Sequence, residues 1–297
     1  MNKKIIVSLS VVAAVAAITV GATTAFFSDT ETSTGNTFTA GAIDLKIDNT
    51  SYVTSTTTGQ LIASPWTSWA LTDLTVEKFF DFIDLKPGDI GEDTISIHVG
   101  SNNAWLCAAA QTYNDEDNGI TEPEEEDGDV DVDNNNLGDD NNDGELDENM
   151  NFVFWVDDGD NVLENCSGQT SGCEDETDSI FLEGTLSEMN SAGQITLADS
   201  ESSILGGIGN PNPIPGDTTF YIGKAWCFGA ITTPGIPQQT GGTPLTVGTG
   251  VTCDGTNVNN QSQTDMVQGD LEFYAEQSRN NLEFTCEDDY TPSWETD

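Results

Sequence analysis

TTFYIGKAWCF, residues 218–228, is the stretch of sequence that decides the fold class. Its apolar side chains, from Phe220 to Phe228, recur at every second position, which places them on one face of a β-strand. Lys224 interrupts that face. The pattern predicts a long strand with one buried face, and a strand of this kind needs a second layer to cover it.

Several other stretches predict strands. Apolar residues alternate at 43–47, 94–99 and 271–275, and an unbroken apolar run at 152–156 indicates a fully buried strand. Shorter strands are predicted at 76–83, 104–111, 180–186 and 195–197, a Ser/Thr loop at 50–64, and a short helix at 199–205 with Asp199 as its N-cap. Many short strands with turn-rich connections predict an all-β fold, a β-sandwich.

The charge of the chain limits its partners. Its 297 residues include 52 acidic and 7 basic residues, a net charge of −45. A surface with this negative charge repels phosphate backbones and anionic lipids. Nucleic acid is therefore not an expected partner. Such a surface favours divalent cations or a high-salt habitat.

The N-terminus has the pattern of an export sequence. Lys3 and Lys4 precede an apolar run at 5–20, and small residues follow at 23–25. This pattern predicts a signal peptide over residues 1–25, and an uncleaved membrane anchor is the alternative. Either one places the rest of the chain outside the cytoplasm. We expect a secreted protein at the cell surface or in the extracellular matrix, with no stable membrane anchor after cleavage.

Six cysteines behind an export sequence predict three disulfides. Cys166 and Cys173 bracket a Ser/Gly turn, and Cys227 and Cys253 bracket a Pro/Gly loop, so each of these is expected to be a pair. Cys107 and Cys286 then form the third. The single histidine, His98, excludes every motif that needs two histidines.

The segment after the export sequence resembles a known family. AFFSDTETSTGNTFTAGAIDL at 25–45 and the later turn LKPGD at 85–89 are similar to the TasA/camelysin family of secreted matrix-fibre proteins. This resemblance implies a jelly-roll subunit that a dedicated signal peptidase processes. It further implies that the freed N-terminal strand completes the sheet of the next subunit, and that some relatives are described as metallopeptidases. The six cysteines and an acidic insertion depart from the family pattern.

The physical chemistry of a free strand agrees with that implication. An extended tail can pair with an open sheet edge of a neighbour, and such head-to-tail contacts form filaments of identical subunits. Residues 26–37 are the expected donor strand, beginning with Phe26, Phe27, Ser28 and Asp29. A tail without regular structure is the alternative. Residues 26–297 are expected to form one jelly-roll-like domain with long acidic and Pro/Gly-rich loops.

The insertion at 114–149 predicts a cation site. It carries seventeen acidic residues between Asp115 and Glu148 and no basic residue. Oxygen ligands at alternate positions with a glycine for the turn are typical of Ca²⁺ loops. The expected ligands are Asp127, Asp129, Asp131, Asp139, Asn141, Asp143 and Asp147. Met150 stands where such a loop normally has a bidentate Glu, so the motif is degenerate. A solvated acidic loop is the alternative, and Asp157, Asp158 and Asp160 form a further candidate group.

Three functions fit these patterns. The first is a non-enzymatic structural subunit of an extracellular filament or biofilm matrix fibre, stabilised by Ca²⁺. The second, a camelysin-like metalloendopeptidase, depends on the family resemblance alone, because no catalytic motif is present. The third is a calcium-dependent adhesin or carbohydrate-binding module, in which Trp66, Trp69 or Trp294 would stack on sugars.

Overall fold

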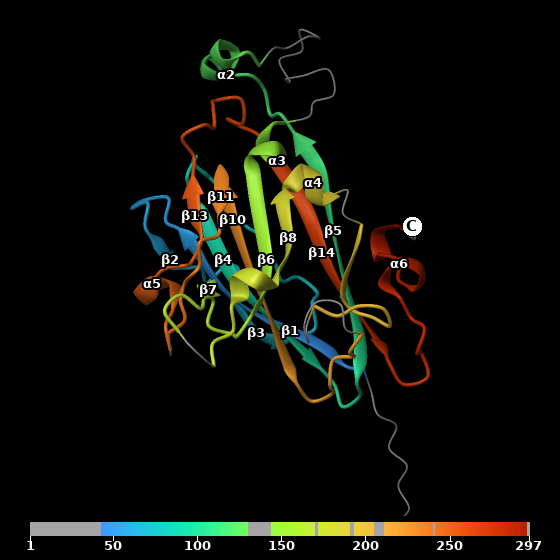
Figure 1. The fold of residues 1–297 in the computed structure, drawn as a ribbon. Helices are drawn as coiled ribbons and strands as arrows, with labels where there is room; N and C mark the ends of the chain where they lie inside the picture. Colours follow the sequence, from blue (N-terminus) through green and yellow to red (C-terminus); the bar gives the residue numbers. More distant parts are fainter. Residues whose placement is uncertain are drawn as a thin grey trace, which may run out of the picture. The chain divides into compact units, whose positions relative to one another are not determined.

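The computed structural model describes residues 43–129, 144–169, 172–190, 193–204, 211–239 and 241–295. Its largest sheet is antiparallel and has seven strands in the order β2-β1-β4-β10-β6-β8, with β3 also pairing with β1 (Figure 1). The strands are β1 (Leu45–Thr54), β2 (Leu61–Ala63), β3 (Trp69–Thr72), β4 (Ile90–Val99), β6 (Met150–Asp157), β8 (Ile180–Thr185) and β10 (Thr219–Phe228).

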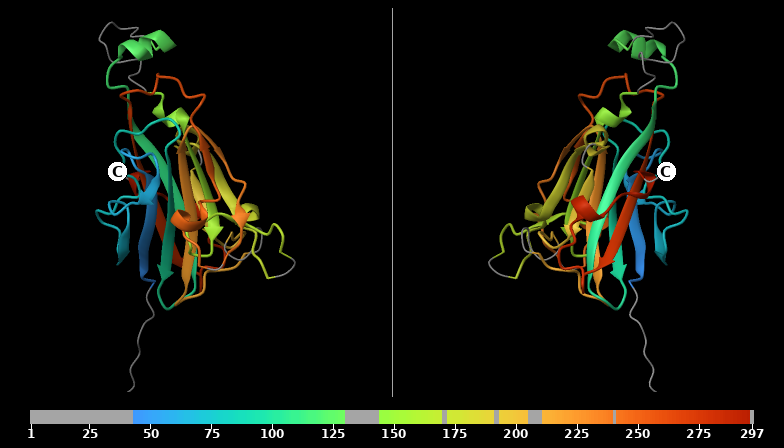
Figure 2. Two further views of the ribbon diagram at one scale, coloured as in Figure 1. Left: turned by 90° about the vertical axis from the view of Figure 1, so that its left-hand side faces the viewer. Right: turned by 90° about the vertical axis from the view of Figure 1, so that its right-hand side faces the viewer.

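A second antiparallel sheet has three strands in the order β14-β5-β9. They are β5 (Ala104–Glu116), β9 (Gln194–Ala198) and β14 (Met266–Gln277). Alternate residues of both sheets meet in one core, in which Ile95 and Ile222 of the large sheet pack with Leu106 and Leu197 of the small one. The described residues therefore form an all-β, two-layer arrangement, whose sheets can be followed from both sides in Figure 2.

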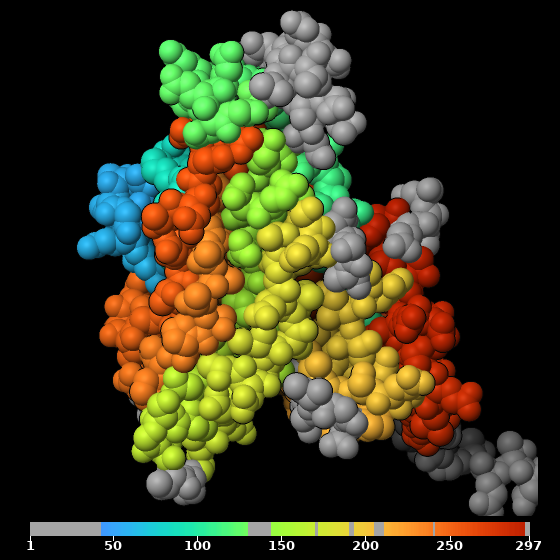
Figure 3. All heavy atoms as spheres, turned by 45° about the horizontal axis from the view of Figure 1, so that its top comes forward, coloured from blue at the N-terminus to red at the C-terminus, as the bar shows by residue number. Residues whose placement is uncertain are grey.

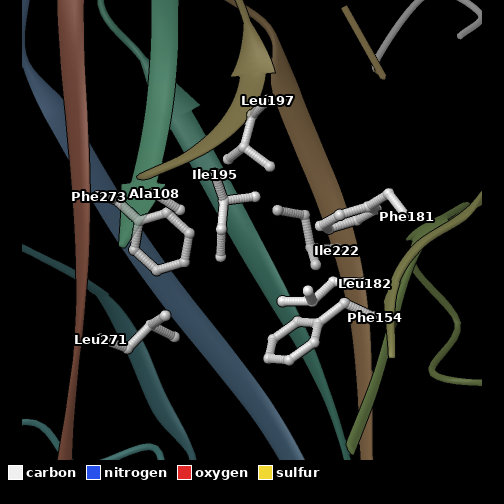
Figure 4. A pocket seen from close by; sticks show the side chains of 9 residues that line it. All are labelled: Ala108, Phe154, Phe181, Leu182, Ile195, Leu197, Ile222, Leu271 and Phe273. Atoms are coloured by element: carbon white, nitrogen blue, oxygen red, sulfur yellow. The ribbon is translucent and has the colours of Figure 1, made fainter. Parts of the chain in front are cut away.

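The core between the sheets is well filled. Four side chains from the large sheet and five from the small one surround a void of about 10 Å³ (Figure 4). The lining residues are Phe154, Phe181, Leu182 and Ile222, and Ala108, Ile195, Leu197, Leu271 and Phe273. A space of this size holds one water at most, and its apolar lining favours an empty void. It offers no room for a ligand.

Short elements cover the outer faces of the two sheets. Over the large sheet lie β7 (Glu164–Asn165), β11 (Ala230–Thr232), β12 (Ile236–Pro237), β13 (Thr252–Asp254) and the 3₁₀ turn η1 (Glu176–Ser179). Over the small sheet lie α6 (Cys286–Asp289) and η2 (Ser293–Glu295). The remaining helices are α2 (Glu122–Asp127), α3 (Leu146–Asn149), α4 (Leu186–Asn190) and α5 (Pro244–Val247). No helix among the described residues is long and apolar enough to cross a membrane.

Three disulfides fasten these covering segments. Cys107 on β5 is bonded to Cys286, Cys227 on β10 is bonded to Cys253 on β13, and Cys166 is bonded to Cys173. They are the same three pairs that the sequence analysis expects. Two of them cross-link a central strand to the segment that lies over its outer face.

Most predicted strands are present, and several are longer than predicted. The strands predicted at 94–99, 152–156 and 271–275 lie within β4, β6 and β14. The stretch at 218–228 forms β10, and its apolar residues face the core as predicted. The all-β prediction is therefore confirmed for the described residues.

Three local predictions are wrong. Residues 76–83 form no strand, because Phe79 and its aromatic neighbours enter the core from an irregular segment. The loop predicted at 50–64 contains the end of β1 and all of β2. Residues 199–204 form no helix, since the Asp199 carboxylate accepts hydrogen bonds from the N–H groups of Glu201 (2.9 Å) and Ser202 (2.8 Å) in a tight turn.

Candidate metal centre between α2 and α3

Three of the seven predicted calcium ligands lie in the described part of the chain. Asp127 is exposed, and its Oδ2 accepts hydrogen bonds from the backbone and side-chain nitrogens of Asn260, both at 2.8 Å. Asp129 and Asp147 are buried, with 4% and 7% of their surface exposed. The other predicted ligands, Asp131, Asp139, Asn141 and Asp143, lie outside the described residues.

Local sequence explains how the turn after α2 buries Asp129. Thr121 and Glu124 form a capping box at the start of the helix, and Pro123 suits its first turn. Gly128 ends the helix in the left-handed conformation, with φ of 101°. The N–H of Asp129 then donates to the carbonyl of Glu124 at 3.1 Å. A turn that only glycine adopts easily thus leaves Asp129 buried, where its charge acts on Glu145.

Asp129 and Asp147 lie within a larger group of carboxylates, which we call the α2–α3 cluster. Its members come from the residue after β5, from α2 and the turn that follows it, from the start of α3 and from the turn before β14, at the upper end of the molecule in Figure 1. They are Asp117, Glu124, Asp129, Glu145 and Asp265, whose charges act on one another, together with buried Asp147, two residues after Glu145 in α3. Segments more than a hundred residues apart in sequence therefore supply one group of like charges.

The backbone fixes one oxygen of several cluster carboxylates and leaves the other available. The N–H of Gly119 donates to Oδ1 of Asp117 at 2.8 Å, and the N–H of Glu145 donates to Oδ2 of Asp265 at 2.7 Å. The second oxygens of both aspartates are buried and have no hydrogen-bond partner among the described residues. Oε2 of Glu145 and Oδ1 of Asp147 are also buried and have no hydrogen-bond partner among the described residues.

Unpartnered buried carboxylate oxygens are costly, and mutual repulsion adds to the cost. Burial, with the charges of Asp129 and Asp117 nearby, raises the pKa of Glu145 to about 7. Burial, with the charges of Glu145 and Asp117, raises the pKa of Asp265 to about 8. None of the ion pairs between described residues brings a lysine to this cluster. The arrangement is one that a bound cation would relieve.

The donor set decides which cation fits. Every cluster member offers carboxylate oxygen, the ligand of hard cations such as Ca²⁺, and none offers the nitrogen or sulfur of a typical zinc site. His98 is elsewhere on the large sheet, where its Nε2 lies 2.7 Å from Asp48 and its Nδ1 lies 3.0 Å from the Thr219 hydroxyl. The cluster therefore suits calcium and lacks the ligands of a peptidase zinc centre.

Four carboxylates of the cluster were not among the expected ligands. Asp117 and Glu124 lie in the acidic insertion away from the alternating residues, Glu145 lies on the alternation between Asp143 and Asp147, and Asp265 lies more than a hundred residues further along. Gly144 packs closely against Asp265, because a Cβ atom at position 144 would lie 2.9 Å from Cγ of Asp265. The glycine of the predicted loop is thus needed where that loop meets β14. This contact depends on the sheet topology, which the sequence pattern does not reveal.

The remaining predicted site residues have separate outcomes. Phe26, Phe27, Ser28 and Asp29 of the expected donor strand lie outside the described residues. Of the tryptophans considered for sugar stacking, Trp66 is 72% exposed. Trp69 packs edge-on against Phe79, and Trp294 packs against the apolar group beneath the C-terminal segment.

Fold and site together define a disulfide-linked β-protein, whose two main sheets are antiparallel, with a buried, oxygen-only candidate cation site. Residues 1–58 match the model of a family described as "Camelysin metallo-endopeptidase". The resemblance of the N-terminal sequence to the TasA/camelysin family is thereby confirmed over these residues, which extend through β1. No curated protein matches the chain. The α2–α3 cluster lies wholly outside the matched residues.

Proposed function

We propose that this chain is an exported structural subunit of an extracellular filament or matrix fibre, and that calcium stabilises it. In this proposal a dedicated signal peptidase removes residues 1–25, and the new N-terminal strand, residues 26–37, pairs with the next copy of the chain. The similarity of residues 1–58 to camelysins supports the processing step. The chain's partner in assembly is a second copy of itself.

The observation that carries this proposal is the free edge of β14. This strand has twelve residues and pairs with β5 on one side, while no described strand pairs with its other side. A long edge strand leaves a row of backbone N–H and C=O groups that another chain can use. An extended donor segment would satisfy those groups, and repetition of that contact would build a filament.

Deletion of residues 26–31 from the mature chain tests the assembly step. We expect the truncated protein to keep its β-rich circular dichroism spectrum and three disulfides, and to form no filaments in negative-stain electron microscopy. Replacing Phe26 and Phe27 by Ser should weaken assembly, whereas the matched change of Ser28 and Thr30 to Ala should not. Normal filaments from the truncated chain would disprove the donor-strand mechanism.

The α2–α3 cluster supports the calcium part of the proposal. Exchange of Asp117 and Asp147 for Asn keeps the side-chain size and removes two negative charges. We expect this variant to lose one calcium equivalent in calorimetry, and to fold as well as the parent protein in chelator. Magnesium should substitute poorly, because a multi-carboxylate site assembled from separate segments suits the larger ion. Equal calcium binding by parent and variant would contradict the assignment.

A camelysin-like peptidase activity is the second candidate, and the family description alone favours it. A zinc peptidase of the two-histidine kind is excluded, because the chain has one histidine. Casein digestion by the purified mature chain, with added zinc and with chelator, separates the two functions. Chelator-sensitive digestion would favour the peptidase.

A further inference from the structure

A second group of carboxylates lies on the outer face of the large sheet, remote from the α2–α3 cluster in the fold. Along β4, Ile95 and Ile97 face the core, so Glu92 and Thr94 face outward. The segments at residues 158–169, 172–179, 230–239 and 241–253 cover this face, and they form much of the yellow-green and orange surface in Figure 3. We call these carboxylates, together with the neighbouring side-chain amide of Asn161, the outer-face cluster: Glu92, Asp157, Asp158, Asp160, Asn161, Glu164 and Glu176.

The geometry of the cluster is compact. Asp157, Asp158 and Asp160 each offer a carboxylate oxygen, and these three oxygens lie within 4.8 Å of one another. The hydroxyl of Thr94 donates to Oδ2 of Asp157 at 2.8 Å, which ties this loop to β4. Glu92 is two residues from Thr94 on the same face of that strand. The fold thus brings a β4 carboxylate to a loop that follows β6.

Several ligand atoms in this group are buried and have no partner. Glu92 is fully buried, and neither of its carboxylate oxygens has a hydrogen-bond partner among the described residues. Oε2 of Glu164, also fully buried, and Oδ1 of Asn161, which is 3% exposed, have none either. Lys224 cannot neutralise them, because it pairs with Asp93 on the opposite face of the sheet. Buried carboxylates without a partner or counter-charge are among the costliest features that a fold can contain.

The protein holds this group in a fixed arrangement. Glu176 accepts hydrogen bonds from the N–H of Asp158 and the N–H of Glu164, both at 2.9 Å, and so joins the two ends of the loop. Gly159 adopts φ of 105° and donates its N–H to Oδ2 of Asp157 at 3.1 Å. The side-chain amide of Asn161 donates to the carbonyl of Thr50 at 2.8 Å. These contacts orient ligand atoms towards one place before any ion arrives.

We propose that the outer-face cluster binds one Ca²⁺ through oxygens of Glu92, Asp157, Asp158, Asp160, Asn161 and Glu164. Six oxygen-bearing residues match the six to eight ligands of Ca²⁺, and the absence of nitrogen or sulfur donors among them disfavours zinc. Burial, together with neighbouring like charges, raises the pKa of Glu92 well above its usual value and that of Asp160 to about 7. A divalent ion would remove this repulsion. The site shares no residue with the proposed donor strand or with the α2–α3 cluster.

The test uses the mature chain carrying Asp117→Asn and Asp147→Asn. These changes are expected to remove calcium binding by the α2–α3 cluster. Into this background we place Glu92→Gln or, separately, Asp160→Asn. The matched control is Glu183→Gln, an exposed carboxylate on β8. Calcium stoichiometry and affinity are measured by calorimetry, and the melting temperature is measured in chelator and in calcium.

The proposal predicts effects of opposite sign in the two conditions. In chelator, Glu92→Gln should melt at the same temperature as its parent or higher, because a buried negative charge is gone. In calcium the order should reverse, with affinity reduced at least about tenfold. Asp160→Asn should weaken binding in the same way, and Glu183→Gln should change neither quantity. Equal stoichiometry, affinity and calcium-dependent melting shift in parent and Glu92→Gln would overturn the proposal.

Terbium provides a readout that locates the ion. The indole Nε1 of Trp155 donates to Oδ1 of Asp157 at 3.3 Å, so an ion in the outer-face cluster would lie close to this ring. Excitation of tryptophan should then produce terbium emission in the background protein, and calcium should compete it away. Glu92→Gln should reduce this emission, whereas Glu183→Gln should not. Absence of sensitised emission in the background protein would also count against the site, whatever the outcome of the filament experiments.

Discussion

Lys224 places a positive charge in the buried centre of the large sheet. It lies in the core face of β10, is fully buried, and forms an ion pair with the equally buried Asp93 directly across on β4. Its ammonium also lies 3.7 Å from the centre of the Phe80 ring. The Lys224→Met change would leave Asp93 buried without its counter-charge. We expect a loss of about 3–5 kcal/mol in the free energy of unfolding, measured by urea denaturation.

A double variant provides the control for this prediction. Lys224→Met combined with Asp93→Leu removes both charges and keeps apolar volume in the core. We expect it to recover most of the lost stability, because replacement of a whole buried ion pair by apolar residues is often close to neutral. If the double variant is less stable than the single one, the ion pair is not what makes Lys224 necessary.

At the scale of elements, the disulfides determine how firmly the covering segments are held. The sequence separations are 179 for Cys107–Cys286, 26 for Cys227–Cys253 and 7 for Cys166–Cys173. Loop-closure entropy then predicts stabilisation of about 5, 3.5 and 2.4 kcal/mol in that order. We expect paired Cys→Ala variants to lose stability in the same order in urea denaturation. The reverse order would show that native-state packing, not chain entropy, controls their effect.

Elements differ in how well the sequence predicts them. β10, β4 and β6 were predictable because their side chains alternate or run apolar within one strand. The segment at 76–83 was not, because its aromatic residues fill the core without forming backbone pairs. The two candidate cation sites also combine residues that a local sequence pattern reveals with residues that only the tertiary fold brings together. The neighbouring aspartates at 157–160 form a local pattern, whereas Glu92 and Asp265 join their clusters through strand pairing between distant parts of the chain.

At the scale of the whole molecule, the net charge of −45 produces two kinds of repulsion. Surface charges repel over distances that salt screens, with a Debye length of about 10 Å at 0.1 M ionic strength. The buried carboxylates of the two clusters repel at short range, where mobile ions do not enter. Sodium chloride therefore reduces the repulsion among surface charges but not the repulsion among the buried carboxylates. A bound divalent cation reduces the repulsion among the buried carboxylates directly.

This difference predicts two separable effects on the melting temperature. When sodium chloride is added to the protein in chelator, the melting temperature should rise gradually. Calcium at constant ionic strength should raise it further, by about 5 °C per site at a hundredfold excess over the dissociation constant. Differential scanning fluorimetry with calcium, magnesium and sodium at matched ionic strength measures both effects. If the calcium and sodium curves coincide, the acidic groups act only as a diffuse surface charge, and neither cluster is a specific site.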